Sequence, residues 1–232
     1  MLTRFAVFSR RIVFLPVLVL GLAGCGSDAP TKCLPPACPT GPGSEFLLAT
    51  TNTGSVVSLK VDQQTGALAA AIPAPGPVVS LGLAAVGSKF LYVSDAGGHA
   101  LNAYSINPST GALAALPGSP FSLGTFSLPI GINARPGANA LYAADAGGVD
   151  GLNINATTGV PTAIPGPPFS SGTNLFLAVD PAGKFLFTSG DDPPGGIFAF
   201  TIDTTTGALT AVPASPFPIP GQTVLTASLL AS

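Results

Sequence analysis

The sequence predicts an all-β protein assembled from repeated four-stranded units, and three observations predict it. A Thr-Gly-Ala or Thr-Gly-Val marker occurs four times, at intervals of 45, 48 and 48 residues. The 232 residues include 29 Gly and 25 Pro, which break helices and favour turns. Only 8 % of the residues are charged, against about 25 % in an ordinary soluble domain, so few positions are expected to face water.

The composition also excludes several other classes of protein. The 8 basic and 10 acidic residues leave no basic excess, so a nucleic-acid partner is not expected. The apolar content of 47 % is too high for a disordered chain. The glycines follow no Gly-X-Y period, which excludes a collagen-like chain.

The first 24 residues have the pattern of a targeting segment. Three arginines precede an apolar stretch over residues 12–22, which is too short to span a bilayer comfortably. The segment ends in Leu22-Ala23-Gly24-Cys25, which resembles the lipobox of bacterial lipoproteins. The resemblance implies that residues 1–24 are a signal peptide and that Cys25 becomes the lipidated first residue. The alternative is an ordinary secretory signal that ends next to a chance cysteine.

Lipid is then the expected membrane anchor. Removing the three arginines of residues 1–24 leaves 5 basic and 10 acidic residues, a net charge of −5, which cannot hold the chain on anionic lipid. Acyl chains anchor by burying CH₂ groups, at about 0.8 kcal/mol each. Gly26 follows the cysteine instead of Asp, and by the sorting pattern of enteric bacteria this implies the outer membrane, facing the periplasm or the cell surface.

Residues 25–45 form the expected tether between the lipid and the fold. Five prolines alternate with Gly, Ser and Thr, a composition typical of an extended, semi-rigid spacer. Cys33 and Cys38 lie within it and either form a small disulfide loop in the oxidising envelope or stay reduced. Two cysteines without a nearby histidine are too few to bind a metal.

The four markers are predicted to be hairpin turns. Each has an Asp or Asn three residues before its threonine, namely Asp62, Asn107, Asn155 and Asp203. Such a side chain can accept hydrogen bonds from the backbone of its own turn, and the glycine can adopt the left-handed conformation that closes it.

Each complete unit carries four short strands in the same order. A first apolar strand is expected at residues 78–84, 128–133 and 175–179, followed by a β-rich run such as Phe90-Leu91-Tyr92-Val93. A Gly-rich turn, an alternating strand, the Thr-Gly hairpin and a last strand ending in Ser-Pro-Phe or Pro-Pro-Phe complete the unit. The expected units span residues 46–73 with 222–232, 77–121, 126–169 and 173–217. Four strands in about 45 residues is the size of a β-propeller blade.

The first unit lacks its first strand, and residues 223–230 have the pattern of one. One hypothesis is that this C-terminal strand completes the first blade and closes a four-bladed ring, which removes an exposed edge. The alternative is a fragment of a larger propeller.

The repeat resembles the lactonase-like β-propellers, which are related to 6-phosphogluconolactonase and to the YVTN surface repeats. The similarity rests on Phe90-Leu91-Tyr92-Val93-Ser94-Asp95, the Asx-x-x-Thr-Gly-Ala-Leu hairpin and the Ser-Pro-Phe ending. It covers residues 46–232 and implies the propeller fold. Members of that family usually have seven blades, whereas this chain has material for four.

One face of the predicted blades, formed by the loops between their second and third strands, carries the candidate ligand-binding residues. These are Asp95, His99, Asp145, Asp150, Asp191 and Asp192. Because the aspartates recur at one position of the repeat, turn capping is the favoured reading, and a ligand site is the alternative. The acidic, basic and histidine set of the lactone-processing relatives cannot be carried over, since His99 is the only histidine and Arg135 the only arginine after the signal.

The expected function is that of a lipid-anchored binding or scaffold module without catalysis, for a protein or carbohydrate ligand. The alternative is a lactone hydrolase of the 6-phosphogluconolactonase-like type. Neither a phosphate-binding loop nor a dinucleotide-binding glycine pattern occurs, so no cofactor is expected. Asp145 and Asp150 offer too few oxygens for a calcium site.

Overall fold

The computed structural model describes residues 45–69, 72–123, 129–166, 174–190 and 196–219, and all regular structure in these ranges is β-strand. The predicted all-β class is therefore confirmed. The strands form four separate antiparallel sheets, one after another along the chain. A search of the same ranges for an apolar helix of membrane-spanning length finds none.

The first sheet has three strands and the second has five. The first contains β1 (Glu45–Thr50), β2 (Ser55–Val61) and β3 (Ile72–Pro75) in this order. The second contains β4 (Leu83–Val86), β5 (Phe90–Asp95), β6 (Ala100–Ile106) and β7 (Leu113–Ala115), with β8 (Phe121–Ser122) paired to the other half of β6. Among the described residues, the first sheet has no strand at the position that β4 holds in the second, as the repeat predicts, whereas β8 is not predicted.

The third and fourth sheets have four strands each. The third contains β9 (Gly131–Ala134), β10 (Ala140–Asp145), β11 (Gly148–Ile154) and β12 (Pro161–Ala163). The fourth contains β13 (Asn174–Val179), β14 (Phe185–Gly190), β15 (Gly196–Ile202) and β16 (Leu209–Ala211). Neighbouring strands in each sheet are also consecutive in the sequence, which is the simple up-and-down connectivity of a propeller blade.

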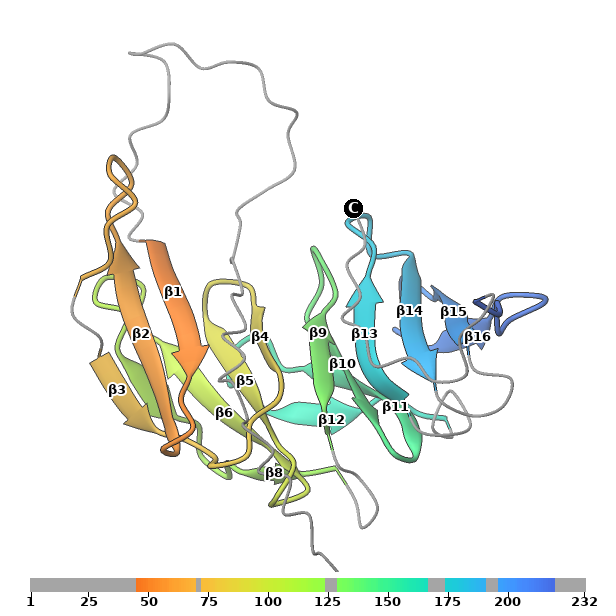
Figure 1. Ribbon diagram of the computed structural model, residues 1–232, viewed down its shortest axis with the longest axis horizontal. Helices are drawn as coiled ribbons and strands as arrows, with labels where there is room; N and C mark the ends of the chain where they lie inside the picture. The colour runs from red at the N-terminus through yellow and green to blue at the C-terminus, as the bar shows by residue number, and fades with distance from the viewer. Residues whose placement is uncertain (1–44, 70–71, 124–128, 167–173, 191–195, 220–232) are drawn as a thin grey trace, which may run out of the picture.

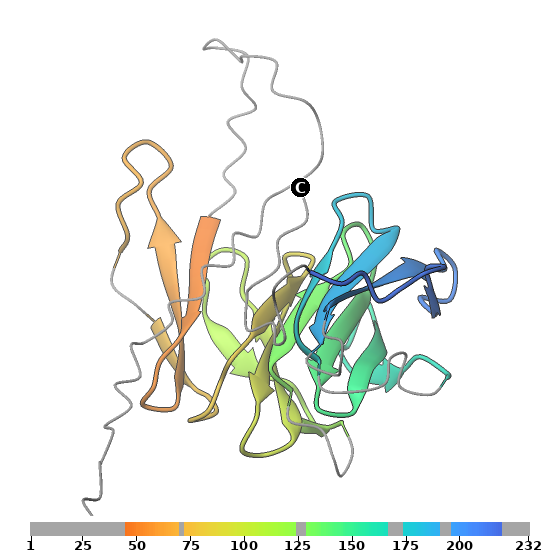
Figure 2. The same ribbon diagram turned by 45° about the vertical axis from the view of Figure 1, so that its right-hand side comes forward.

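The four sheets stand side by side along an arc, with the first and fourth sheets at its two ends (Figures 1 and 2). The strand β9 contacts both β4 and β13, so these first strands of consecutive sheets form the inner side of the arc. Residues 222–232, which are predicted to complete the first blade, lie outside the described residues. Ring closure therefore stays a prediction.

The core consists of three apolar clusters, and each lies between two consecutive sheets. Between the second and third sheets, Tyr92 and Leu101 pack with Leu141 and Leu152. Equivalent clusters join the first sheet to the second and the third sheet to the fourth. Both faces of a central sheet are thus buried, which explains why so few of its side chains are charged.

The Thr-Gly turns close as predicted. Asn155 accepts hydrogen bonds from the backbone N–H groups of Thr157 and Thr158, each at 2.9 Å. The three equivalent Asx residues accept the same pair of hydrogen bonds in their own turns. The glycines of the four turns all have a positive φ, between 71° and 77°. The Asx side chain and the left-handed glycine therefore produce the same turn conformation at all four markers.

The Ser-Pro-Phe endings bring the chain back across the third strand of the blade. Ser119 accepts a hydrogen bond of 2.9 Å from the N–H of Ala103, and Ser215 accepts one of 3.0 Å from Ala199. In the second sheet this places Phe121 and Ser122 beside Leu101 and Ala100 as β8.

Several boundaries differ from the sequence prediction, and the strand expected at residues 128–133 is observed at Gly131–Ala134. The strand expected at residues 78–84 is observed at Leu83–Val86, and Val78 is 68 % exposed. The apolar residues 78–81 instead belong to the connection that crosses from β3 to the inner side of the arc. Gly82 then approaches the third sheet so closely that an added Cβ atom would lie 2.7 Å from the carbonyl oxygen of Ile130. Glu45, predicted as part of the tether, is the first residue of β1.

Candidate functional site

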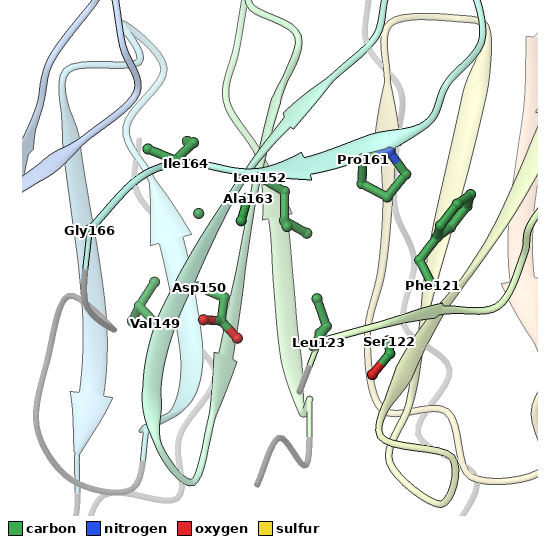
Figure 3. A pocket seen from close by; sticks show the side chains of 11 residues that line it. Phe121, Ser122, Leu123, Val149, Asp150, Leu152, Pro161, Ala163, Ile164 and Gly166 are labelled. Atoms are coloured by element: carbon green, nitrogen blue, oxygen red, sulfur yellow. The ribbon is translucent and has the colours of Figure 1, made fainter. Parts of the chain in front are cut away.

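A pocket of about 250 Å³ lies between the outer strands of the second and third sheets. Phe121, Ser122 and Leu123 line it from the second sheet, and Asp150 and Pro161 are among its lining residues from the third. Figure 3 shows Asp150 on β11 on one side of this pocket, with Ser122 and Leu123 on the other. A carboxylate and a hydroxyl therefore share a small space that apolar side chains such as Phe121 and Leu152 also line.

Asp150 is placed in the pocket by the start of β11. The strand begins at Gly148, so Asp150 is its third residue and not part of the turn in which it was predicted. Side chains alternate along a strand, so Asp150 shares the face of Leu152, which packs in the cluster between the second and third sheets. At the same repeat position the second sheet has Asn102 and the fourth has Phe198, so a carboxylate here is particular to the third sheet.

Asp145 stands next to Asp150 and is only 5 % exposed. It ends β10, and it accepts a hydrogen bond of 2.6 Å from the N–H of Gly147 in the following turn. Three causes together raise the pKa of Asp150 to about 6, and burial is the largest; the charge of Asp145 and a hydrogen bond with its carboxyl group are the other two. The neighbouring carboxylate and the burial both disfavour the charged form of Asp150, so this group keeps its proton to a higher pH than an ordinary aspartate does.

Asp95 and His99 also belong to the predicted face, and each makes hydrogen bonds within its own blade. Asp95 accepts a hydrogen bond of 2.8 Å from the N–H of Gly98 and one of 3.4 Å from the amide of Asn102. It therefore caps its turn, as the favoured reading of the aspartates expects. His99 has a left-handed backbone with a φ of 53°, and its carbonyl oxygen accepts a hydrogen bond of 3.3 Å from Leu123. The backbone of His99 thus helps to position Leu123, which lines the pocket.

Several predicted residues lie outside the described residues. These are Asp191 and Asp192 on the candidate face, Cys25 at the expected lipidation site, and Cys33 and Cys38 in the expected tether. Their roles stay predictions. Within the described ranges, no cluster of three or more metal-ligating side chains is present.

Arg135 lies in the turn between β9 and β10 and has a structural role there. Its Nε donates a hydrogen bond of 2.8 Å to the carbonyl oxygen of Gly183, and its Nη1 donates one of 3.2 Å to that of Thr204. Both acceptors belong to turns of the fourth sheet, so this guanidinium joins the third sheet to the fourth.

Comparison with solved structures shows what the arrangement of sheets resembles. A protein named "putative 6-phosphogluconolactonase" from Bacteroides uniformis aligns with a TM-score of 0.60 and 17 % identity, over 74 % of this chain and 54 % of its own. A protein of the same description from Bacteroides fragilis aligns with a TM-score of 0.57 and 21 % identity, over 72 % and 53 %. A functionally unknown protein from Desulfotomaculum acetoxidans gives a TM-score of 0.55 at 17 % identity, over 72 % and 51 %.

These similarities establish the class of fold, a β-propeller. The chain spans about half the length of the solved structures that it matches. No protein-family model and no curated protein matches the sequence. At these identities the similarity concerns the fold alone.

The pocket itself was not predicted from the sequence. Phe121 was recognised as part of the Ser-Pro-Phe ending and Asp150 as a candidate, but nothing in the sequence indicates that they meet. Their neighbourhood depends on how two consecutive sheets pack. The detectable signal is the single carboxylate at a repeat position that is Asn or Phe in the neighbouring units.

Proposed function

We propose that this chain is a lipid-anchored binding module of the bacterial cell envelope that holds a small, hydroxyl-rich ligand in the pocket around Asp150. The observation that carries the proposal is the pocket between the second and third sheets. Its volume of about 250 Å³ suits a ligand of monosaccharide size, since drug-sized sites begin at roughly 300 Å³.

The lining of the pocket supports this class of ligand. Asp150 and Ser122 supply oxygen atoms that accept hydrogen bonds from ligand hydroxyl groups. Phe121 and Pro161 supply apolar ring surfaces against which the C–H groups of a sugar can pack. Anchoring through Cys25, with residues 26–44 as a spacer, would present this pocket to the periplasm or to the outside of the cell.

The ligand proposal is tested by saturation-transfer NMR on the purified full-length protein with a panel of neutral monosaccharides. Binding should be detected for at least one sugar and lost in Asp150→Ala. Asn153→Ala, which removes an exposed side chain from the same strand, is the matched control and should bind normally. Absence of binding to every sugar, or equal binding by Asp150→Ala, would exclude this site.

The anchor is tested separately by labelling growing cells with palmitate. Label should enter the wild-type protein and be absent from Cys25→Ala. Label in Cys25→Ala, or none in the wild type, would remove the anchor from the proposal without affecting the pocket.

A second candidate function is hydrolysis of a sugar lactone. It is favoured by the raised pKa of Asp150, about 6, which is suited to a general base near neutral pH. Two of the structural neighbours also carry the name of a lactonase. The assay is hydrolysis of glucono-δ-lactone above its spontaneous rate, compared among the wild type, Asp150→Asn, His99→Ala and Asn153→Ala. Turnover that rises with pH through about 6 and disappears in Asp150→Asn would favour the hydrolase.

A further inference from the structure

In three of the four Thr-Gly turns, the glycine lies where its sheet contacts the sheet before it. Gly111 lies directly against the ring of Phe46. A Cβ atom added at Gly159 would lie 2.6 Å from the ring of Phe90, and one added at Gly207 would lie 2.7 Å from Ile164. Three of the four turns are therefore covered by apolar side chains of the preceding sheet.

The turn of the first sheet is the exception. Gly66 has the same backbone conformation, with a φ of 71°, but no described atom lies within 4 Å of a Cβ atom added there. Leu68 follows it in the turn and is 50 % exposed, whereas Leu209 at the same position of the fourth sheet is 7 % exposed. The Thr-Gly turn of the first sheet is therefore exposed, whereas the equivalent turns of the other three sheets are covered by a preceding sheet.

At the other end of the arc, the fourth sheet has an exposed aromatic side chain that could cover such a turn. Phe185 occupies the position of Phe46 and Phe90, the two rings that cover a turn glycine. Phe90 is 7 % exposed but Phe185 is 41 % exposed. Phe187 lies on the same face, with its ring centre 6.5 Å from that of Phe185. The fourth sheet thus presents uncovered rings of the kind that cover these turns elsewhere.

The first sheet also carries the apolar side chains that such a contact requires. Leu47 and Leu59 are directly opposite each other on β1 and β2, as Leu91 and Tyr104 are on β5 and β6. Leu91 and Tyr104 pack against the first sheet in the core. The outer face of the first sheet therefore has apolar side chains at the same positions as the face of the second sheet that packs against the first.

We propose that these two end faces dock between copies of this chain, with Phe185 and Phe187 of one copy against Gly66 and Leu68 of a second copy. The contact continues the packing found between consecutive sheets inside the chain. A second copy is required because the two end sheets of one chain lie at opposite ends of the arc (Figures 1 and 2). Two copies joined at both ends would form an eight-bladed ring, within the usual range of four to eight blades.

The first test measures the mass of the purified full-length protein by light scattering. The wild type should have at least twice the mass of one chain, and both Phe185→Asp and Leu68→Asp should have the mass of one chain. Mixing these two variants should restore a two-chain species, because each supplies the intact face that the other lacks. Val78→Asp is the matched control, since Val78 is 68 % exposed and lies in the connection between β3 and β4.

The outcomes separate docking from other association. A wild-type protein with the mass of one chain would overturn the proposal. Association that persists in Phe185→Asp would overturn it as well, because contact through residues 1–44 does not need Phe185. Restoration in the mixture also shows that both variants are folded.

The second test uses disulfide cross-linking between two differently tagged copies. Gly66→Cys in one copy and Phe185→Cys in the other should cross-link, above the background of chains with one substitution. Gly137→Cys replaces Gly66→Cys in the control, because Gly137 is another open turn glycine with a φ of 69°. A cross-link that forms only when both substitutions are in one chain would overturn the proposal in favour of closure within the chain.

Discussion

The hydroxyl group of Tyr142 donates a hydrogen bond of 2.7 Å to the carbonyl oxygen of Gly207 and so joins the third sheet to the Thr-Gly turn of the fourth. Tyr92 makes the equivalent hydrogen bond, of 2.5 Å, to Gly159 one repeat earlier. Both tyrosine side chains are completely buried. The marker that identifies the repeat in the sequence is therefore also the point where one blade is attached to the next.

Tyr142→Phe should destabilise the protein without changing its fold. The ring still fills its place, but the Gly207 carbonyl is left buried without this partner, which costs about 1–3 kcal/mol. The free energy of unfolding in urea measures the effect. Tyr142→Leu, which also removes ring contacts, should cost more. Equal stability of the wild type and Tyr142→Phe would mean that the hydrogen bond adds nothing.

The tyrosines should also make the protein sensitive to alkaline pH. Burial raises the pKa of Tyr142 to about 12 and raises that of Tyr92 as well. The unfolded chain loses these protons near pH 10, so the stability that they contribute is complete below pH 10 and falls as the pH rises towards 12. Urea unfolding at a series of pH values from 8.5 to 11.5 should show this decline, and Tyr142→Phe should show a shallower one.

Asp150→Asn should stabilise the protein at pH 8 but not at pH 4. The pKa of Asp150 is about 6 in the folded protein against 3.8 for an ordinary aspartate, so the folded state holds the proton more tightly. The resulting stability is present below about pH 4 and is lost as the pH rises through 6. The amide does not ionise, so a gain on the order of 1 kcal/mol is expected at pH 8, after allowance for solvent screening. A gain of equal size at both pH values would contradict this origin.

The glycines of two equivalent turns should differ in their tolerance of alanine. Gly66→Ala introduces only the strain of a left-handed alanine, about 1–2 kcal/mol, because no described atom lies near the new methyl group. Gly111→Ala adds a collision with the ring of Phe46. Urea unfolding of the two variants, monitored below the concentration at which copies associate, should show the larger loss for Gly111→Ala. Equal losses would mean that Phe46 moves aside freely.

The Asx residue should stabilise its turn through its side-chain oxygen. Asn155→Ala removes two acceptor contacts, to Thr157 and Thr158, and should cost about 1 kcal/mol. Asn155→Asp keeps the oxygen and should cost less. Asn153→Ala is the control, because Asn153 is exposed in the adjacent strand. Thermal unfolding by circular dichroism measures all three.

Features defined by local sequence could be predicted here. The Asx-x-x-Thr-Gly pattern predicts a turn in which Asp62, Asn107, Asn155 and Asp203 accept backbone hydrogen bonds, and the structure confirms each one. The absence of a first strand in the first sheet follows from the same repeat phase. Each of these features depends on a few neighbouring residues.

Features that depend on the contact between sheets could not be predicted. Residues 78–81 are apolar enough for a strand, yet they form a crossing connection, because the sheet begins only where Gly82 meets Ile130. The proximity of Asp145 and Asp150 depends on where β11 begins, two residues before Asp150. The pocket requires Ser122 from one sheet and Asp150 from the next, and a repeat pattern contains no information about that distance.

Within the part of the chain that the structure describes, the core clusters lie between sheets that follow each other in the sequence, and this makes a single chain, before a second copy docks, a linear array in the thermodynamic sense. Opening a terminal sheet breaks one interface, whereas opening an inner sheet breaks two. Amide hydrogens of β1 and β2 should therefore exchange with solvent sooner than those of β5 and β10. The array would unravel from its ends inward, so damage to a terminal blade would leave the two central blades and the pocket between them folded.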